Sequence, residues 1–74
     1  MVLDAEYMLV LLENYTLAAE HYSWAVSEWT RQIEKGIPTA DRERFKLAVV
    51  FPARQTAAQS REDVQVAKHD VGRL

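Results

Sequence analysis

The stretch KGIPT, residues 35–39, is the only strong turn signal in this chain of 74 residues. Gly36 suits the left-handed backbone conformation that ends many helices, and Pro38 cannot continue a helix. Thr39 is of a residue type that caps the start of a helix. We therefore expect one domain, residues 1–74, with a helix over about 3–35, a turn at 36–39 and a helix over about 40–72.

Apolar residues recur at steps of three and four on both sides of this turn, which is the spacing of a coiled coil. In the first segment the repeat runs through Ala5, Met8, Leu12, Tyr15, Ala19, Tyr22, Val26, Trp29 and Ile33. In the second it runs through Val50, Ala53, Ala57, Ser60, Val64, Ala67, Val71 and Leu74. The pattern predicts an all-α antiparallel two-helix hairpin. Its seam is expected to consist of Met8, Leu12, Tyr15, Tyr22, Val26, Trp29, Val50, Ala53, Ala57 and Val64.

Pro52 interrupts the second repeat in the sequence VVFPARQ, residues 49–55. A proline inside a helix removes one backbone hydrogen bond and clashes with the preceding turn. Because the periodicity resumes at Ala53, we expect a kinked helix. The alternative is a break at Pro52 that divides the hairpin into three helices.

Several large apolar residues lie off the predicted seam, and a hairpin has no third element to cover them. Exposed apolar patches of this extent usually mark an interface. We expect an interface formed by Leu9, Val10, Leu17, Trp24, Phe45, Val49, Phe51 and Val66. Trp24 falls nearly opposite the predicted seam, so it is the best candidate for a contact outside its own hairpin. The simplest arrangement is a homodimer in which two hairpins form a four-helix bundle.

The composition narrows the function classes. The chain has no cysteine, so disulfides, cysteine-based zinc sites and a thiol nucleophile are excluded. Its net charge is −2, which gives no general basic surface for a nucleic-acid backbone. No segment approaches the length of about 20 apolar residues that a membrane helix needs. We expect a cytoplasmic protein that does not interact with membranes.

Residues that could carry chemistry do not form a recognisable site. Glu20 and His21 are adjacent, so on a helix their side chains point about 100° apart. Glu62 is followed three positions later by Gln65, whereas carboxylate-bridged metal sites in helical bundles use Glu-x-x-His. No serine has a histidine and an acid at a spacing that would form a triad, and there is no glycine-rich phosphate loop. We predict no enzymatic activity, no metal and no cofactor.

Charged residues form two regular stripes and one cluster. The acids Glu6, Glu13 and Glu20 recur every seven residues, and so do the bases Arg54, Arg61 and Lys68. The two stripes could meet across the hairpin, could meet between protomers, or could be ordinary solvated faces. The cluster, at the expected hairpin tip, combines five bases with interleaved acids. These bases are Arg31, Lys35, Arg42, Arg44 and Lys46.

These observations predict a non-catalytic protein–protein interaction or assembly module that self-associates, with a dimer as the favoured state. A small regulatory or inhibitory protein that binds a different protein would satisfy the same pattern. A helical protein that binds nucleic acid through the basic hairpin tip is a weaker alternative, because the interleaved acids compensate the basic charge.

Overall fold

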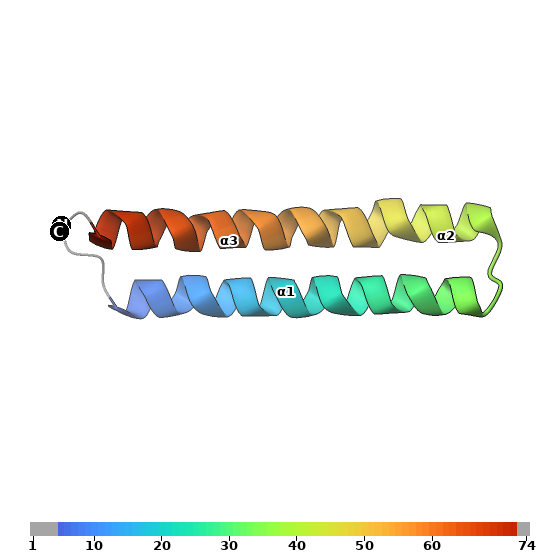
Figure 1. Cartoon of the computed structure of the whole chain (residues 1–74), viewed down its shortest axis with the longest axis horizontal. Coiled ribbons are helices and arrows are strands. Elements are labelled where there is room, and N and C mark those ends of the chain that lie inside the picture. Colours follow the sequence, from blue (N-terminus) through green and yellow to red (C-terminus); the bar gives the residue numbers. More distant parts are fainter. Residues whose placement is uncertain (1–4, 73–74) are drawn as a thin grey trace.

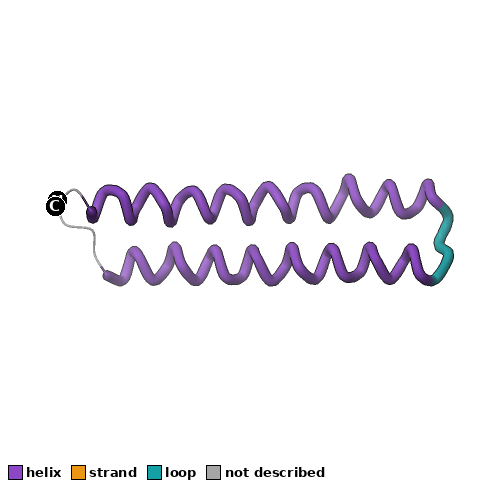
Figure 2. Tube along the Cα trace, viewed as in Figure 1, coloured by secondary structure: helices purple, strands orange, loops and turns teal. Residues whose placement is uncertain are grey.

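The computed structural model describes residues 5–72, with side chains described for residues 5–69. Helix α1 spans Ala5–Glu34, α2 spans Thr39–Phe45, the π-helical turn η1 spans Lys46–Val50, and α3 spans Phe51–Gly72. Every described residue outside 35–38 is helical, and no strand occurs among the described residues (Figure 2). The all-α prediction is therefore confirmed.

The chain folds into two arms that lie side by side and run in opposite directions (Figure 1). The first arm is α1, and the second arm is the continuous helical stretch formed by α2, η1 and α3. Along its Cα atoms the hairpin extends over 54 × 14 × 14 Å. It is a narrow rod only two helices wide, so each helix has one side against its neighbour and most of its circumference outside that contact.

The turn between the arms ends α1 with a glycine in the left-handed conformation. Gly36 has φ +71°. The backbone N–H of Ile37 donates to the carbonyl of Gln32 at 3.0 Å, and the N–H of Gly36 donates to the carbonyl of Ile33 at 3.1 Å. This pair of bonds satisfies carbonyls that the end of a helix leaves unpaired. The expected glycine C-cap is thus confirmed.

The start of the second arm differs from the expectation by one residue. Pro38 occupies the N-cap position of α2, Thr39 is the first helical residue, and no side chain caps the helix start. The side chain of Arg42 stabilises the turn in another way. Its Nε donates to the Ile37 carbonyl at 3.0 Å, and its guanidinium donates to the Thr39 hydroxyl at 2.9 Å.

Pro52 is accommodated by a π-helical turn and does not break the second arm. The backbone N–H of Phe51 donates to the carbonyl of Lys46, five residues earlier, in place of the usual four. A proline ring at position 52 would crowd the carbonyl of Ala48 in a regular α-helix. The wider turn of η1 lies immediately before this proline, which is the position where that crowding has to be relieved. The three-helix alternative is wrong, because helical structure continues through residue 52.

Small side chains form the contact between the arms. Ala25 has no exposed surface, and it clusters with Val50 and Ala53 from the second arm. Tyr22, Trp29, Phe45 and Val49 pack around this cluster and are only partly buried. Among the described residues, the buried apolar side chains are all alanine or valine: Ala18, Ala25, Val50, Ala53, Ala57, Val64 and Ala67.

The seam of α1 is rotated relative to the sequence prediction. Met8, Tyr15, Tyr22 and Trp29 belong to both the predicted and the observed seam, and each is partly buried. The prediction places the other seam residues four positions after each of these. In the structure they lie three positions after, at Leu11, Ala18, Ala25 and Gln32. At about 100° per residue, this change rotates the seam by about 50° around α1.

The predicted seam residues Leu12 and Val26 are therefore corrected. They are 36% and 37% exposed and lie at the edge of the inter-helix contact. The physical reason is the closeness of the arms. A helix that presents Ala18 and Ala25 can approach its neighbour more closely than one that presents Leu12 and Val26, and close packing is what a narrow seam requires. Hydrophobicity alone favours the larger side chains and so predicts the wrong column.

Candidate protein-interaction face

One face of the hairpin contains three hollows along its length. The first, of about 550 Å³, lies near the tip between Glu28 and Phe45. The second, of about 440 Å³, lies near the middle between Trp24 and Pro52. The third, of about 310 Å³, lies toward the free ends and is lined by Tyr7 and Val66 among others. We call this side of the hairpin the hollowed face.

Large apolar side chains stand exposed along the hollowed face. Trp24 lines the middle hollow and is 53% exposed, and Leu17 and Val10 precede it by seven and fourteen residues in the same column of α1. Tyr7 and Val66 are also exposed and meet at the third hollow. The face therefore carries an apolar stripe from one end of the rod to the region of the tip.

The surroundings of Trp24 differ from the prediction. Its indole stacks on the imidazole of His21, with ring centroids 5.6 Å apart and an interplanar angle of 19°. Its edge meets the ring of Phe45 from the second arm at 6.4 Å. The 50° rotation of α1 contributes to the difference, because it turns Trp24 from nearly opposite the seam toward the second arm. Trp24 is thus positioned by both arms while half of its surface stays open.

The eight predicted interface residues separate onto two sides. Six of them belong to the hollowed face: Val10, Leu17, Trp24, Phe45, Val49 and Val66. Val10 and Leu17 share the column of Trp24, whereas Leu9 is rotated by about 100° from that column and Phe51 lines a separate hollow with Arg54. Sequence reasoning grouped the eight because all fall outside the predicted seam, but being off the seam does not specify a side.

Beside Trp24, the middle hollow is lined mostly by short side chains that sequence reasoning did not select. Ala18 comes from α1, while Ala48, Pro52 and Thr56 come from the second arm, next to the predicted seam residue Ala53. The recurrence of alanine at positions 18 and 25 was the available signal, since small residues seven apart mark a place of close approach. The short side chains that line the middle hollow leave a notch next to the protruding indole of Trp24.

The indole of Trp29 carries the only buried side-chain nitrogen or oxygen of the described residues that has no hydrogen-bond partner. Its ring packs against the Ala25 cluster, and the Lys46 ammonium lies 5.8 Å from its centroid. An unpaired buried donor costs about 1–3 kcal/mol. Trp29 is therefore held for its apolar bulk and not for its N–H group.

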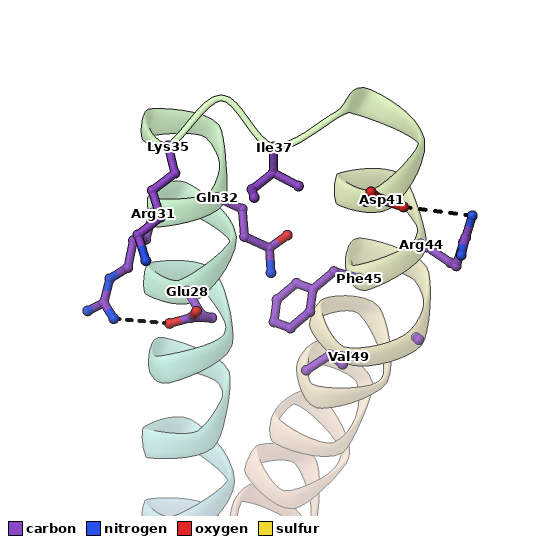
Figure 3. Close-up of a pocket in the computed structure, with 10 residues that line it drawn as sticks. Glu28, Arg31, Gln32, Lys35, Ile37, Asp41, Arg44, Phe45 and Val49 are labelled. Atoms are coloured by element: carbon purple, nitrogen blue, oxygen red, sulfur yellow. Dashed lines mark ion pairs between the residues drawn. The ribbon is translucent and has the colours of Figure 1, made fainter.

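The bases at the hairpin tip are mostly engaged with local partners (Figure 3). Arg31 pairs with Glu28 at 3.4 Å, Arg44 pairs with Asp41 at 3.8 Å, and Lys46 pairs with Glu43 at 2.9 Å. Arg42 is used to close the turn, as described above. Exposed pairs of this kind contribute little stability, but they compensate the positive charge of the tip. Figure 3 shows Ile37, Gln32 and Phe45 directed into the space between the arms, with the charged groups directed outward.

No group of three potential metal-ligating side chains converges within the described residues. Likewise, no helix in the described part of the chain is long and apolar enough to cross a membrane. Comparison with protein-family models, with curated proteins and with solved structures finds no match. The hollowed face is consequently the feature of this hairpin on which a functional argument can be built.

Proposed function

We propose that this chain is a non-catalytic protein–protein interaction module that self-associates through its hollowed face. The observation that carries the proposal is the distribution of side-chain size. The buried residues of one copy are alanines and valines, whereas Tyr7, Leu17 and Trp24 stand more than half exposed. Fully burying a large apolar side chain contributes about 1.5–3 kcal/mol, so these three side chains leave hydrophobic stabilisation unused in a single hairpin.

The exposed area supports the same proposal. The chain exposes 5688 Å². A compact monomer of its mass, 8.5 kDa, would expose about 4,650 Å². The excess of about 1,000 Å² is similar to the area of about 800 Å² that each partner contributes to a standard protein interface. An isolated two-helix rod is thus missing about as much burial as one partner would supply.

The favoured assembly is a homodimer in which two hollowed faces pack together as a four-helix bundle. A two-fold contact uses the same patch on both copies, so the patch must complement itself. The hollowed face carries both a protruding Trp24 and, beside it, the notch lined by Ala18, Pro52 and Thr56. In such a dimer the indole of each copy would enter the notch of the other.

The mass of the unaltered chain in solution tests this proposal. Sedimentation equilibrium over micromolar concentrations is expected to show a species of twice the 8.5 kDa chain mass that dissociates on dilution. A mass of one chain at every concentration would contradict self-association. The expected doubling of mass occurs in the pure protein. This result therefore distinguishes self-association from binding to a different protein.

A further inference from the structure

The acid stripe of α1 lies on the outer side of the first arm. This stripe precedes the seam column of Met8, Tyr15 and Tyr22 by two residues at each step; it consists of Glu6, Glu13 and Glu20. At about 100° per residue these positions lie nearly opposite the seam. All three side chains are exposed. We call this stripe the acid ridge.

The basic stripe of the second arm lies on the side away from the hollowed face. Arg54 follows the buried Ala53, and Lys68 follows the buried Ala67, with Arg61 midway between them. Pro52 lines the middle hollow, and Arg54 is about 200° further around the same helix, past the seam. Arg54 instead lines a shallow hollow with Phe51 and Ala58. We call this stripe the basic ridge.

The two ridges cannot pair within one copy. The acid ridge lies opposite the inter-helix contact, while the basic ridge lies along the edge of that contact on the other arm. Within the described part of the chain, Glu13, Glu20, Arg54, Arg61 and Lys68 take part in no ion pair. The three ion pairs described above each join residues three apart on one helix. The possibility that the stripes meet across the hairpin is therefore wrong.

We propose that the acid ridge of one copy binds the basic ridge of a second copy. Glu13 and Glu20 repeat at the same seven-residue interval as Arg54, Arg61 and Lys68, about 10.5 Å along a helix, so two pairs can form at once. The apolar neighbours of the basic ridge, Leu47 and Phe51, are 61% and 43% exposed and give the contact an apolar border. The occupant is another copy of this chain because the chain itself carries the complementary row of charges with the same spacing.

This contact differs in kind from the proposed dimer. It joins two different surfaces, so it is heterologous and can extend from copy to copy, either closing into a ring or growing as a filament. It leaves the hollowed face uncovered and does not depend on the function proposed above. Since exposed ion pairs are individually weak and strongly screened, the assembly is expected to form at low ionic strength and to dissociate in salt.

Charge reversal followed by mixing tests the proposal. One variant reverses the acid ridge with Glu13→Lys and Glu20→Lys, and the other reverses the basic ridge with Arg54→Glu and Arg61→Glu. At about 0.01 M salt, where the screening length is about 30 Å, each variant alone is expected to lose at least tenfold of the species larger than a dimer. An equimolar mixture is expected to regain them, because the reversed α1 of one variant now faces the reversed second arm of the other.

A matched control separates ridge pairing from general attraction between oppositely charged proteins. The pair Glu34→Lys and Glu43→Lys makes the same change in net charge as the acid-ridge variant, but leaves both ridges and the lining of the three hollows intact. Mixed with the basic-ridge variant, it is expected not to restore large species. Circular dichroism of each variant, read for helix content, verifies that the exposed substitutions leave the hairpin folded.

The proposal is overturned if sedimentation of the unaltered chain shows the same distribution at about 0.01 M and about 1 M salt. It is equally overturned if the mixture of the two ridge variants stays as small as either variant alone. A dimer that persists in both ridge variants is the expected background from the hollowed face. Loss of the ridge contact therefore remains distinguishable from failure of the proposed dimer.

Discussion

Replacing Ala25 by leucine is expected to destabilise the hairpin by about 1–3 kcal/mol, the usual cost of overpacking a close-packed contact. Ala25 has no exposed surface and touches the cluster of Val50 and Ala53 in the second arm. A longer side chain at this position must push the arms apart along the narrowest part of the seam. In a domain of this size such a loss lowers the melting temperature by about 4–8 °C per kcal/mol.

Ala58→Leu is the matched control for this substitution. Ala58 is exposed on the second arm, so leucine at that position adds the same atoms without entering the seam. Alanine and leucine both favour helix, which keeps the difference in helix propensity small. Urea denaturation followed by circular dichroism, at one fixed protein concentration, is expected to show a lower midpoint for Ala25→Leu alone. Equal midpoints for the two variants would mean that Ala25 does not lie between the arms.

Trp24→Ala is expected to weaken self-association by about 2 kcal/mol or more, or about 30-fold in the dissociation constant. Tryptophan residues at the centre of interfaces are frequent hot spots, and this indole stands 53% exposed beside a notch lined by small residues. Its ring contacts within one copy are the stack on His21 and the edge contact with Phe45, and about half of its surface is already exposed. The substitution should therefore affect association more than folding.

Leu9→Ala is the control that separates the two faces. Leu9 is 56% exposed, close to the exposure of Trp24, but on α1 it is rotated by about 100° from the column that contains Trp24. The sequence placed both residues in one interface, whereas the structure separates them. Association constants from sedimentation equilibrium are expected to change for Trp24→Ala and to stay within about threefold of the original for Leu9→Ala. Equal losses would contradict the assignment of the hollowed face.

The sequence predicts the seven-residue spacing of the seam, but it does not predict which side of α1 faces the second arm. In the second arm one column of small residues alternates with charged and polar neighbours, and its members Val50, Ala53, Ala57 and Val64 are buried. In α1 two alternative columns flank Met8, Tyr15, Tyr22 and Trp29, and both are apolar except for Gln32. The choice between them depends on how closely the arms approach, which is a property of both helices together. Hydrophobicity therefore favours the column with the larger side chains, although the column with the smaller side chains forms the contact.

The consequences of Pro52 and of the charge stripes also depend on three-dimensional packing. A proline in a periodic helix indicates that the backbone must adapt, but kink, break and π-turn relieve the same clash and have the same sequence signature. Likewise, two charge stripes of equal period are compatible with pairing within or between copies. The positions of the two stripes relative to the seam exclude pairing within one copy. These positions depend on the 50° rotation of α1. Dimer formation and a cytoplasmic location stay predictions.

The accessibility of Trp24 as a function of concentration tests the central claim most directly. The chain has two tryptophans, so Trp29→Phe leaves Trp24 as the single fluorescent indole. This substitution removes the N–H group that has no partner and keeps an aromatic ring in the seam. If hairpins associate through the hollowed face, acrylamide quenching of Trp24 will fall as concentration rises, over the same range in which the mass doubles. A doubling of mass with unchanged quenching of Trp24 would contradict the account.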